Sequence, residues 1–445
     1  MMKNPEKPPE RRITGDELNC LENPDIDKLI REANEKYLYW SEFKYKIGSI
    51  DIDPEILWGI VKLFRNSGAE RIKISDIPEF EIKYNLTADI LQKLHEFDLH
   101  FVGSPPGEEI IPANDKNQYL ISSIMEEAIA SSQIEGAATT RKEAKKMLRE
   151  ERKPKNKSEQ MILNNYNTIK KLKDFKDKEL TKELLKEIHS SITKDTLSDP
   201  CQEGFFRKSN DIIVINRDGE ISYVPPDYKH LDKILNDFCI FANETNTKRF
   251  IHPIIRAAIL HFLIGYIHPF TDGNGRTARA IFYWYLLKKG YWLIEYISIS
   301  RMIIKSRGQY SKAYLFSELD ENDLTYFINY QLKTLKMAFD SLKEYINRKI
   351  QEKRKLHDFG RIKDINDRQV IILKLLSDDP ELSFTIKEIQ NRFNTVYQTA
   401  RTDLIGLEKS GLIKKRTTGK KKLIYHRSEN FSEILAELIG KTRLT

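Results

Sequence analysis

Cysteine is scarce in this sequence, and its placement is not that of a metal site or a disulfide framework. The chain has three cysteines, Cys20, Cys201 and Cys239, and no two of them form a C-x-x-C pair. This spacing supports neither a zinc site nor a set of structural disulfides. Because so low a count is typical of a reducing compartment, we expect a cytoplasmic protein.

Long hydrophobic runs are also absent. The longest apolar run covers the 11 residues 257–267, and His261 interrupts it. That length is too short to cross a bilayer, which needs about 20 residues. Residues 1–12 are polar and hold no apolar stretch of the kind found in a secretory signal. We therefore expect no membrane partner.

Neither sign of charge strongly outweighs the other, and basic residues are only slightly in excess. The 445 residues include 74 basic and 66 acidic side chains, which gives a formal net charge of +8. This excess permits a nucleic-acid or acidic protein partner but does not require one. At this length we expect two or three domains rather than a single core.

Helical patterns dominate the chain, so the predicted fold class is mainly α. Periodicity and breaks in composition divide the sequence into consecutive parts. These are a flexible arm over 1–25, a helical extension over 26–110, a central helical domain over 111–340 with a helix at about 118–136, a linker helix over 341–362, a C-terminal module over 363–430 and a tail over 431–445.

One short β-hairpin is expected inside the central domain. Residues 211–216 are strand-like, an Asp-Gly turn signal follows at 218–219, and a second apolar run covers 221–224. Two consecutive prolines then end the pattern. The central residues of the first strand are Ile213, Val214 and Ile215.

A segment between two predicted helices carries the strongest chemical signal. Residues 268–279 read His-Pro-Phe-Thr-Asp-Gly-Asn-Gly-Arg-Thr-Ala-Arg. The glycines allow backbone N–H groups to approach a ligand closely, and the start of a helix favours anions. Arg276 and Arg279 are spaced i, i+3, so they share one helix face. Two arginines beside a helix N-terminus indicate a polyphosphate site.

Two further side chains of this segment suit metal binding and proton transfer. Asp272 offers hard oxygen ligands just before the turn, and Mg²⁺ on phosphates typically uses one or two carboxylates. His268 can act as a base near neutral pH. Each feature alone is more often a loop or a packed residue. Their occurrence together within one short segment favours a catalytic phosphate site.

At every fixed position this segment resembles the signature of the Fic family, H-P-F-x-[DE]-G-N-G-R-x-x-R. The resemblance implies a role for each position. His268 would deprotonate the attacking hydroxyl of a target protein, and Asp272 would hold Mg²⁺ between the α- and β-phosphates of ATP. The backbone at the turn would form an anion hole, made by Gly273, Asn274 and Gly275.

For the remaining positions the resemblance implies phosphate binding by Arg276, contact of Arg279 with the γ-phosphate, and packing of Phe270 under the loop. The implied activity is transfer of AMP from ATP to a protein hydroxyl, the chain's own included. Two alternatives stay open. One is de-AMPylation or transfer of another nucleotide or phosphate-linked group at the same site. The other is a DNA-binding regulator whose core senses a nucleotide.

Other segments resemble further parts of this family. Gly-Phe-Phe-Arg at 204–207 precedes the hairpin, as in many Fic domains. The hairpin itself resembles the flap that pins a target segment by strand addition, although a plain surface hairpin is the alternative. Tyr310 is a candidate for lining the adenine pocket, with an ordinary core tyrosine as the alternative. Proteins of this kind often form homodimers.

A built-in inhibitor is also implied. Residues 131–136, Ser-Ser-Gln-Ile-Glu-Gly, resemble the family's inhibitory motif [ST]-x-x-x-E-[GN]. In that motif Ser131 takes the first position, and Glu135 would pair with Arg279 and take the place of the γ-phosphate. A solvated glutamate at a helix end is the alternative.

The C-terminal module resembles a winged helix-turn-helix. Three short helical patterns over 367–409 precede two strand-like runs. Gln398, Arg401 and Thr402 would lie on the recognition helix. Residues 366–427 hold 13 basic and 7 acidic side chains, a net of +6, so most of the chain's excess lies here. The two interpretations are binding to DNA phosphates and a module that packs on other domains or docks targets.

Overall fold

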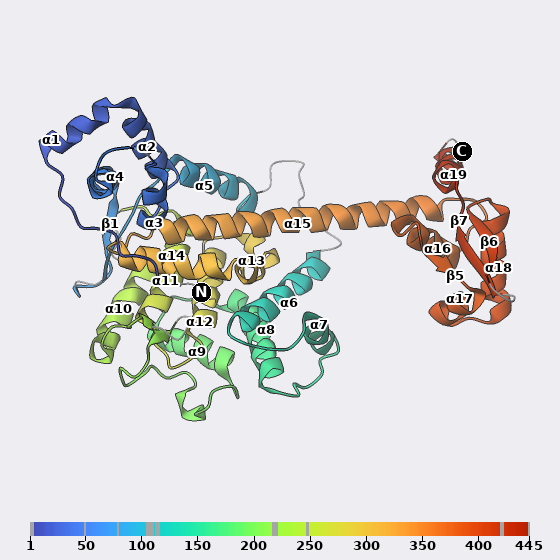
Figure 1. Cartoon of the computed structure of the whole chain (residues 1–445). Coiled ribbons are helices and arrows are strands. Elements are labelled where there is room, and N and C mark those ends of the chain that lie inside the picture. The colour runs from blue at the N-terminus through green and yellow to red at the C-terminus, as the bar shows by residue number, and fades with distance from the viewer. Residues whose placement is uncertain are drawn as a thin grey trace. The chain divides into compact units, whose positions relative to one another are not determined.

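The computed structural model describes residues 4–48, 50–77, 80–103, 111, 116–215, 221–245, 249–418 and 422–443 (Figure 1). The chain is mainly helical, as predicted, and it divides into two compact units, Met1–Leu342 and Lys343–Thr445. The predicted turn at 218–219 lies outside the described residues. None of the helices in the described ranges is both long and apolar enough to span a membrane.

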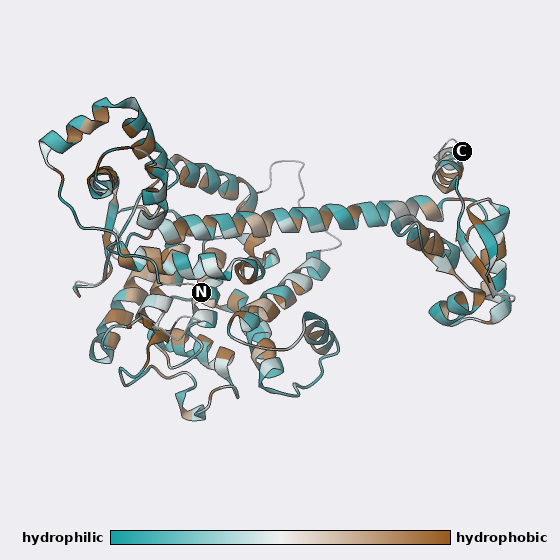
Figure 2. Ribbon diagram, in the orientation of Figure 1, coloured by the Kyte–Doolittle hydropathy of each residue, from teal (hydrophilic) through white to brown (hydrophobic). Residues whose placement is uncertain are grey.

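The first unit begins with a helical region. Its elements are α1 (Gly15–Leu18), η1 (Asn19–Glu22), α2 (Pro24–Glu35), α3 (Trp40–Phe43), η2 (Lys44–Lys46), α4 (Pro54–Gly68), β1 (Glu70–Lys73), β2 (Glu81–Tyr84) and α5 (Ala88–Phe101). Figure 2 shows hydrophilic and hydrophobic residues alternating along α2, whose buried side packs on α4. The antiparallel hairpin β1–β2 is an addition to the expected helices.

Residues 4–25 differ from the flexible arm expected there. Thr14 caps α1 through a capping box, which starts the helix at Gly15. Ile13 packs so closely on α4 that a β-carbon at Gly59 would lie 2.4 Å from its Cδ1. Glu6, further toward the N-terminus, is also held: its carbonyl oxygen accepts a 2.8 Å hydrogen bond from the Tyr39 hydroxyl. Specific contacts therefore hold a segment whose polar composition alone suggested disorder.

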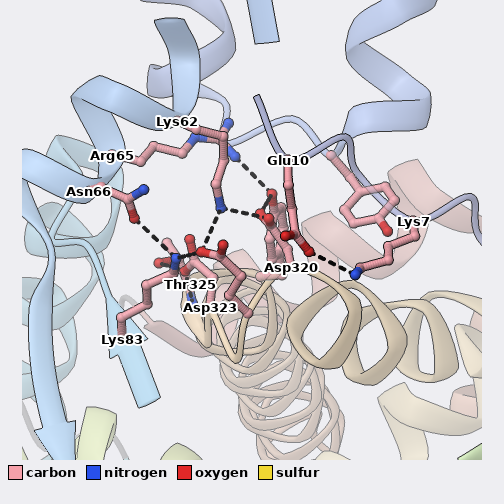
Figure 3. A network of polar contacts seen from close by, with 12 residues as sticks. Lys7, Glu10, Lys62, Arg65, Asn66, Lys83, Asp320, Asp323 and Thr325 are labelled. Atoms are coloured by element: carbon pink, nitrogen blue, oxygen red, sulfur yellow. Dashed lines mark hydrogen bonds and ion pairs between the residues drawn. The ribbon is translucent and has the colours of Figure 1, made fainter. Parts of the chain in front are cut away.

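A buried polar network joins this region to the C-terminal part of the first unit. Figure 3 shows Lys62, Arg65 and Lys83 gathered around Asp320 and Asp323. Both aspartates are almost completely buried, and Lys62 Nζ lies 2.6 Å from Asp320 Oδ1. Charges removed from water in this way are tolerated because they pair with one another.

The remaining helices of the first unit surround one buried helix. The elements are α6 (Lys116–Ile134), α7 (Arg141–Arg149), α8 (Lys157–Phe175), α9 (Lys182–Thr193), η5 (Pro200–Gln202), β3 (Val214–Ile215), β4 (Ile221–Tyr223), η6 (Tyr228–His230), α10 (Leu231–Ala242), α11 (Pro253–Ile267), α12 (Asn274–Lys288), η7 (Trp292–Tyr296), α13 (Ile299–Lys305), α14 (Arg307–Leu319) and α15 (Thr325–Gly360), the last running into the second unit. Nearly every side chain of α11 is buried, as its apolar composition predicts. The site segment follows α11 directly.

The second unit has its own hydrophobic core. After the end of α15 come α16 (Asp367–Asp378), β5 (Ser383–Phe384), α17 (Ile386–Phe393), α18 (Tyr397–Lys409), β6 (Ile413–Thr418), β7 (Lys422–Arg427) and α19 (Phe431–Arg443). The strands form an antiparallel sheet in the order β5-β7-β6. The predicted tail over 431–445 instead contains α19, because Phe431 and Leu435 are buried in this core.

Candidate active site

The loop between α11 and α12 has a defined conformation at both of its ends. His268 ends α11 in the left-handed region at φ 49°, and Gly273 begins α12 at φ 83°. Asn274, the first residue of α12, holds the loop through Phe270: its Oδ1 accepts from the Phe270 N–H at 2.9 Å, and its Nδ2 donates to the Phe270 carbonyl at 2.8 Å. The buried ring of Phe270 lies beneath the loop, as the resemblance implied.

The predicted base, His268, is held with one ring nitrogen free to accept a proton. Its Nδ1 lies 3.2 Å from the carbonyl oxygen of Gly265. Because a carbonyl can only accept, Nδ1 carries the hydrogen and Nε2 keeps its lone pair. Burial lowers the pKa of His268 from its usual value, although the bond to Gly265 opposes this. The imidazole is therefore neutral at physiological pH, which is the form a base requires.

Asp272 reaches outward from the loop. Its side chain is 57% exposed, and its Oδ1 accepts from the N–H of Gly273 at 2.5 Å. Within the described ranges, no three His, Cys, Asp or Glu side chains gather into a metal-binding group. One protein carboxylate is nevertheless enough for Mg²⁺ at a nucleotide, because the ion takes its other ligands from phosphates and water.

Arg276 and Arg279 leave α12 on one face, as their spacing predicted, and both are buried. Arg276 Nη1 donates to the carbonyl oxygen of Ile192 at 3.2 Å. The Nε of Arg276 and the Nη1 of Arg279 are buried without a hydrogen-bond partner in the protein. Buried donors of this kind are costly unless a ligand completes them. They suit an anion bound at the start of α12.

The end of α6 closes over the same helix start. Arg279 Nη2 donates to Glu135 Oε1 at 2.8 Å, so the predicted ion pair is present. Ser131 receives two further bonds from Arg279: Nε to its Oγ at 2.9 Å and Nη2 to its carbonyl at 3.0 Å. A β-carbon at Gly275 would lie 2.2 Å from Glu135 Oε1. The carboxylate therefore rests against the predicted anion hole.

Tyr310, on α14, lies both in an aromatic cluster and beside the site. Its hydroxyl is 2.9 Å from Nε2 of the buried His261, and its ring contacts that of Tyr314. Burial raises the pKa of Tyr310 to about 12, and the charges of Arg279 and Glu135 also influence it. The position agrees with either interpretation, core tyrosine or adenine-lining residue.

The predicted flap is a two-stranded hairpin with exposed apolar residues. Val214 pairs with Tyr223 and Ile215 pairs with Ile221, with an irregularity between the two pairs. Ile213, just before β3, and Ile221 are each about half exposed. The side chain of Ile215 and the turn at 216–220 lie outside the described residues. The outer edge of an apolar hairpin of this kind can receive an added strand.

Two residues of the site had been given no role from the sequence. The backbone N–H of Arg207 donates to the Pro269 carbonyl, and its Nε donates to the His268 carbonyl, both at 2.9 Å. Its Nη2 donates to the carbonyl of Pro226 at the base of the flap. The Nε2 atom of His189 lies 2.8 Å from the carbonyl oxygen of Asp272. The feature of the sequence that could have identified His189 is its position on the apolar face of α9.

A known protein family matches the part of the chain that contains the loop between α11 and α12. Residues 179–286 match the model of the Fic/DOC family. "Protein adenylyltransferase Fic" of Drosophila virilis is 30% identical over 153 residues, which are 34% of this chain and 28% of that protein. The protein of the same name from Aedes aegypti is 34% identical over 105 residues, 24% of this chain and 19% of that protein.

Among solved structures, a Fic-1 fragment from C. elegans superposes with a TM-score of 0.48 at 18% identity, over 76% of this chain and 87% of the fragment. The chain spans less than a third of the length of these two curated relatives.

Proposed function

We propose that this chain, whose residues 179–286 are a Fic/DOC-family domain, is a protein adenylyltransferase that transfers AMP from ATP to a hydroxyl side chain. One observation carries the proposal. A neutral histidine base, an exposed carboxylate and two buried arginines with unpartnered donors meet at the start of α12. Two curated relatives with that name, 30% and 34% identical over part of this chain, support it.

The geometry supports a single in-line transfer. ATP would lie with its phosphates at the N-terminus of α12, where Arg276 and Arg279 donate to them. His268 Nε2 removes the proton of the target hydroxyl, and that oxygen attacks the α-phosphorus. The bond from the α-phosphorus to the bridging oxygen breaks, and pyrophosphate leaves. Positioning and charge neutralisation supply most of the rate.

Asp272 is the residue that would hold Mg²⁺ against the phosphates. When bound, Mg²⁺ neutralises charge on the departing pyrophosphate. The Gly273 N–H bond to Oδ1 holds the carboxylate at the edge of the anion-binding turn.

Autoinhibition is the second part of the proposal. Glu135 neutralises Arg279 and lies against Gly275, so its negative charge is where the third phosphate of ATP would bind. Two negative groups in a partly buried site repel strongly. ATP would then be held away from the reactive pose until the end of α6 moves.

Mass spectrometry of the intact protein tests both parts. Wild type, Glu135→Gly and the double variant Glu135→Gly,His268→Ala are incubated with ATP and Mg²⁺. An added AMP that is more abundant on Glu135→Gly than on wild type, and absent from the double variant, supports transfer and inhibition together. No adduct on any chain, either on itself or on added proteins, contradicts the proposal. Release of AMP from a pre-modified protein would instead favour the reverse reaction.

We also propose that the second unit binds duplex DNA. From α16 to β7 its elements follow the order helix, strand, two helices and two strands, and α19 comes after them. This order supports the proposal of a winged helix. Asn394, at φ 45°, forms the tight turn between α17 and α18. The side chains of Gln398, Arg401 and Thr402 on α18 are all exposed. Those of Lys414 and Lys415 on β6 are more than half exposed.

Fluorescence anisotropy of the full chain with a labelled 30-base-pair duplex, at several salt concentrations, tests DNA binding. Each phosphate contact adds about −0.9 to the slope of log affinity against log salt, so Lys414→Gln should reduce the slope by about 1. Lys170→Gln, on α8 of the first unit, is the matched control. Binding that disappears at physiological salt, or that Lys414→Gln leaves unchanged, favours a protein-docking module instead.

A further inference from the structure

His189 is buried on α9 with both ring nitrogens engaged. Its Nδ1 accepts a 3.1 Å hydrogen bond from the N–H of Gly204. Because that backbone group can only donate, Nδ1 carries no hydrogen, and Nε2 must carry it. The Nε2–H therefore donates to the carbonyl oxygen of Asp272 at 2.8 Å. One neutral tautomer thus joins the 204–207 segment to the loop before α12.

The same ring leaves the loop little room to move. It stacks on Phe270 with centroids 3.6 Å apart and planes 2° from parallel. A β-carbon at Gly273 would lie 3.2 Å from His189 Nε2 and 2.7 Å from Thr193 Cγ2. Helix α9 therefore packs directly against the Asp272–Gly273 turn. Burial lowers the pKa of His189 to about 4, so the neutral tautomer persists at physiological pH.

The side chain of Asp272 has weaker support than its backbone. It is 57% exposed, and its hydrogen bond comes from the N–H of the adjacent Gly273. Its charged partner is Arg276, whose Nη2 lies 3.9 Å from Oδ1, beyond hydrogen-bond distance. The direction of the carboxylate therefore follows the conformation of the turn, which His189 holds through the Asp272 carbonyl. Groups that orient a metal ligand without touching the metal commonly change metal affinity about 10- to 100-fold when removed.

We propose that His189 is a positioning residue that sets the carboxylate of Asp272 for Mg²⁺ by fixing the backbone of the Asp272–Gly273 turn. This inference rests on the proposed function, because it needs a metal-assisted nucleotide site at Asp272. The metal ligand remains Asp272, and His189 acts on it only through the main chain.

Two substitutions distinguish the hydrogen bonds made by the two ring nitrogens of His189. The side-chain amide of asparagine can reach the position of Nδ1, so His189→Asn keeps the bond to Gly204 and loses that to Asp272. The amide of glutamine can reach the position of Nε2, so His189→Gln keeps a donor to Asp272. Both variants lose the imidazole stack on Phe270, so a general loss of packing affects them alike.

The measurement is ATP binding by calorimetry, with Mg²⁺ and with EDTA. All variants carry Glu135→Gly and His268→Ala, so that ATP can enter and no transfer follows. We expect His189→Asn to reduce the gain in affinity due to Mg²⁺ about 10-fold. His189→Gln should stay within about 3-fold of the parent. In EDTA all three chains should bind ATP equally.

An equal loss of the Mg²⁺-dependent gain in both variants, or a loss that also appears in EDTA, overturns the inference. Should His189→Asn fail to fold, a His189→Gln chain without the Mg²⁺-dependent gain would overturn it too. A parent that binds ATP no better with Mg²⁺ overturns the metal assignment of Asp272 along with the role of His189. Normal Mg²⁺-dependent binding in a chain whose Glu135→Gly form transfers no AMP contradicts the proposed activity alone.

Discussion

Gly275 of α12 and Glu135, which directly follows α6, are far apart in the sequence, and they lie so close that a side chain at position 275 would displace the Glu135 carboxylate. A β-carbon at position 275 would lie 2.2 Å from Glu135 Oε1 and 3.3 Å from Arg279 Nη1. The glycine at the start of α12 therefore does two things. It lets backbone N–H groups approach an anion, and it makes room for the carboxylate that rests there.

Gly275→Ala tests whether this space belongs to the γ-phosphate. In a Glu135→Gly background the carboxylate is gone, and the new methyl group occupies its place. Overpacking costs about 1–3 kcal/mol, so ATP should bind about 10-fold more weakly. ADP, which lacks the γ-phosphate, should be little affected. Calorimetry with both nucleotides measures this, and equal weakening of ADP would place the methyl group against another phosphate.

The rate of AMP transfer should depend on pH through His268. Burial lowers the pKa of His268 below its usual 6.5, and the base must be unprotonated. The single-turnover rate of the Glu135→Gly chain should therefore rise as pH increases through the region below 6.5. It should be level between pH 7 and 8. A rate that still climbs across that interval would assign the base to another group.

Stability should fall in acid, partly because of His189. The pKa of His189 is about 4 in the folded chain and near 6.5 when unfolded, so the unfolded chain binds the proton more readily. The free energy of unfolding is then reduced as pH falls from 6.5 toward 4, by about 3 kcal/mol. His189→Gln should lose less stability than wild type over this interval. Urea unfolding at several pH values compares them, and parallel curves would contradict the assignment.

The buried network of the first unit should be sensitive to the loss of one charge. Asp320 is 2% exposed, pairs with Lys62 and accepts from the Tyr326 hydroxyl at 2.8 Å. Asp320→Asn leaves a buried cation poorly compensated, and we expect a loss of about 3 kcal/mol in the free energy of unfolding. Asp340→Asn, which breaks a partly exposed i, i+4 pair with Lys336, should cost less than about 0.5 kcal/mol. Equal effects would mean that the network is not desolvated.

Features that depend on near neighbours could be read from the sequence. The helix over 253–267 follows from its apolar run, and the start of α12 follows from the Gly-Asn-Gly turn. The shared face of Arg276 and Arg279 follows from the helical period. The ion pair between Glu135 and Arg279 was predicted as well, but only through resemblance to a family motif. Periodicity contains no information about which residues meet across 144 positions.

Contacts between distant segments were decided by the tertiary structure alone. His189 and Asp272 are 83 positions apart, and only the packing of α9 beneath the loop brings them together. Tertiary packing also decides the contacts of Arg207, which joins the base of the flap to His268. It likewise orders residues 4–25, whose polar composition suggested disorder. Local propensity sets where a helix begins and which side is apolar, whereas burial and hydrogen bonding between helices decide which polar groups become a site.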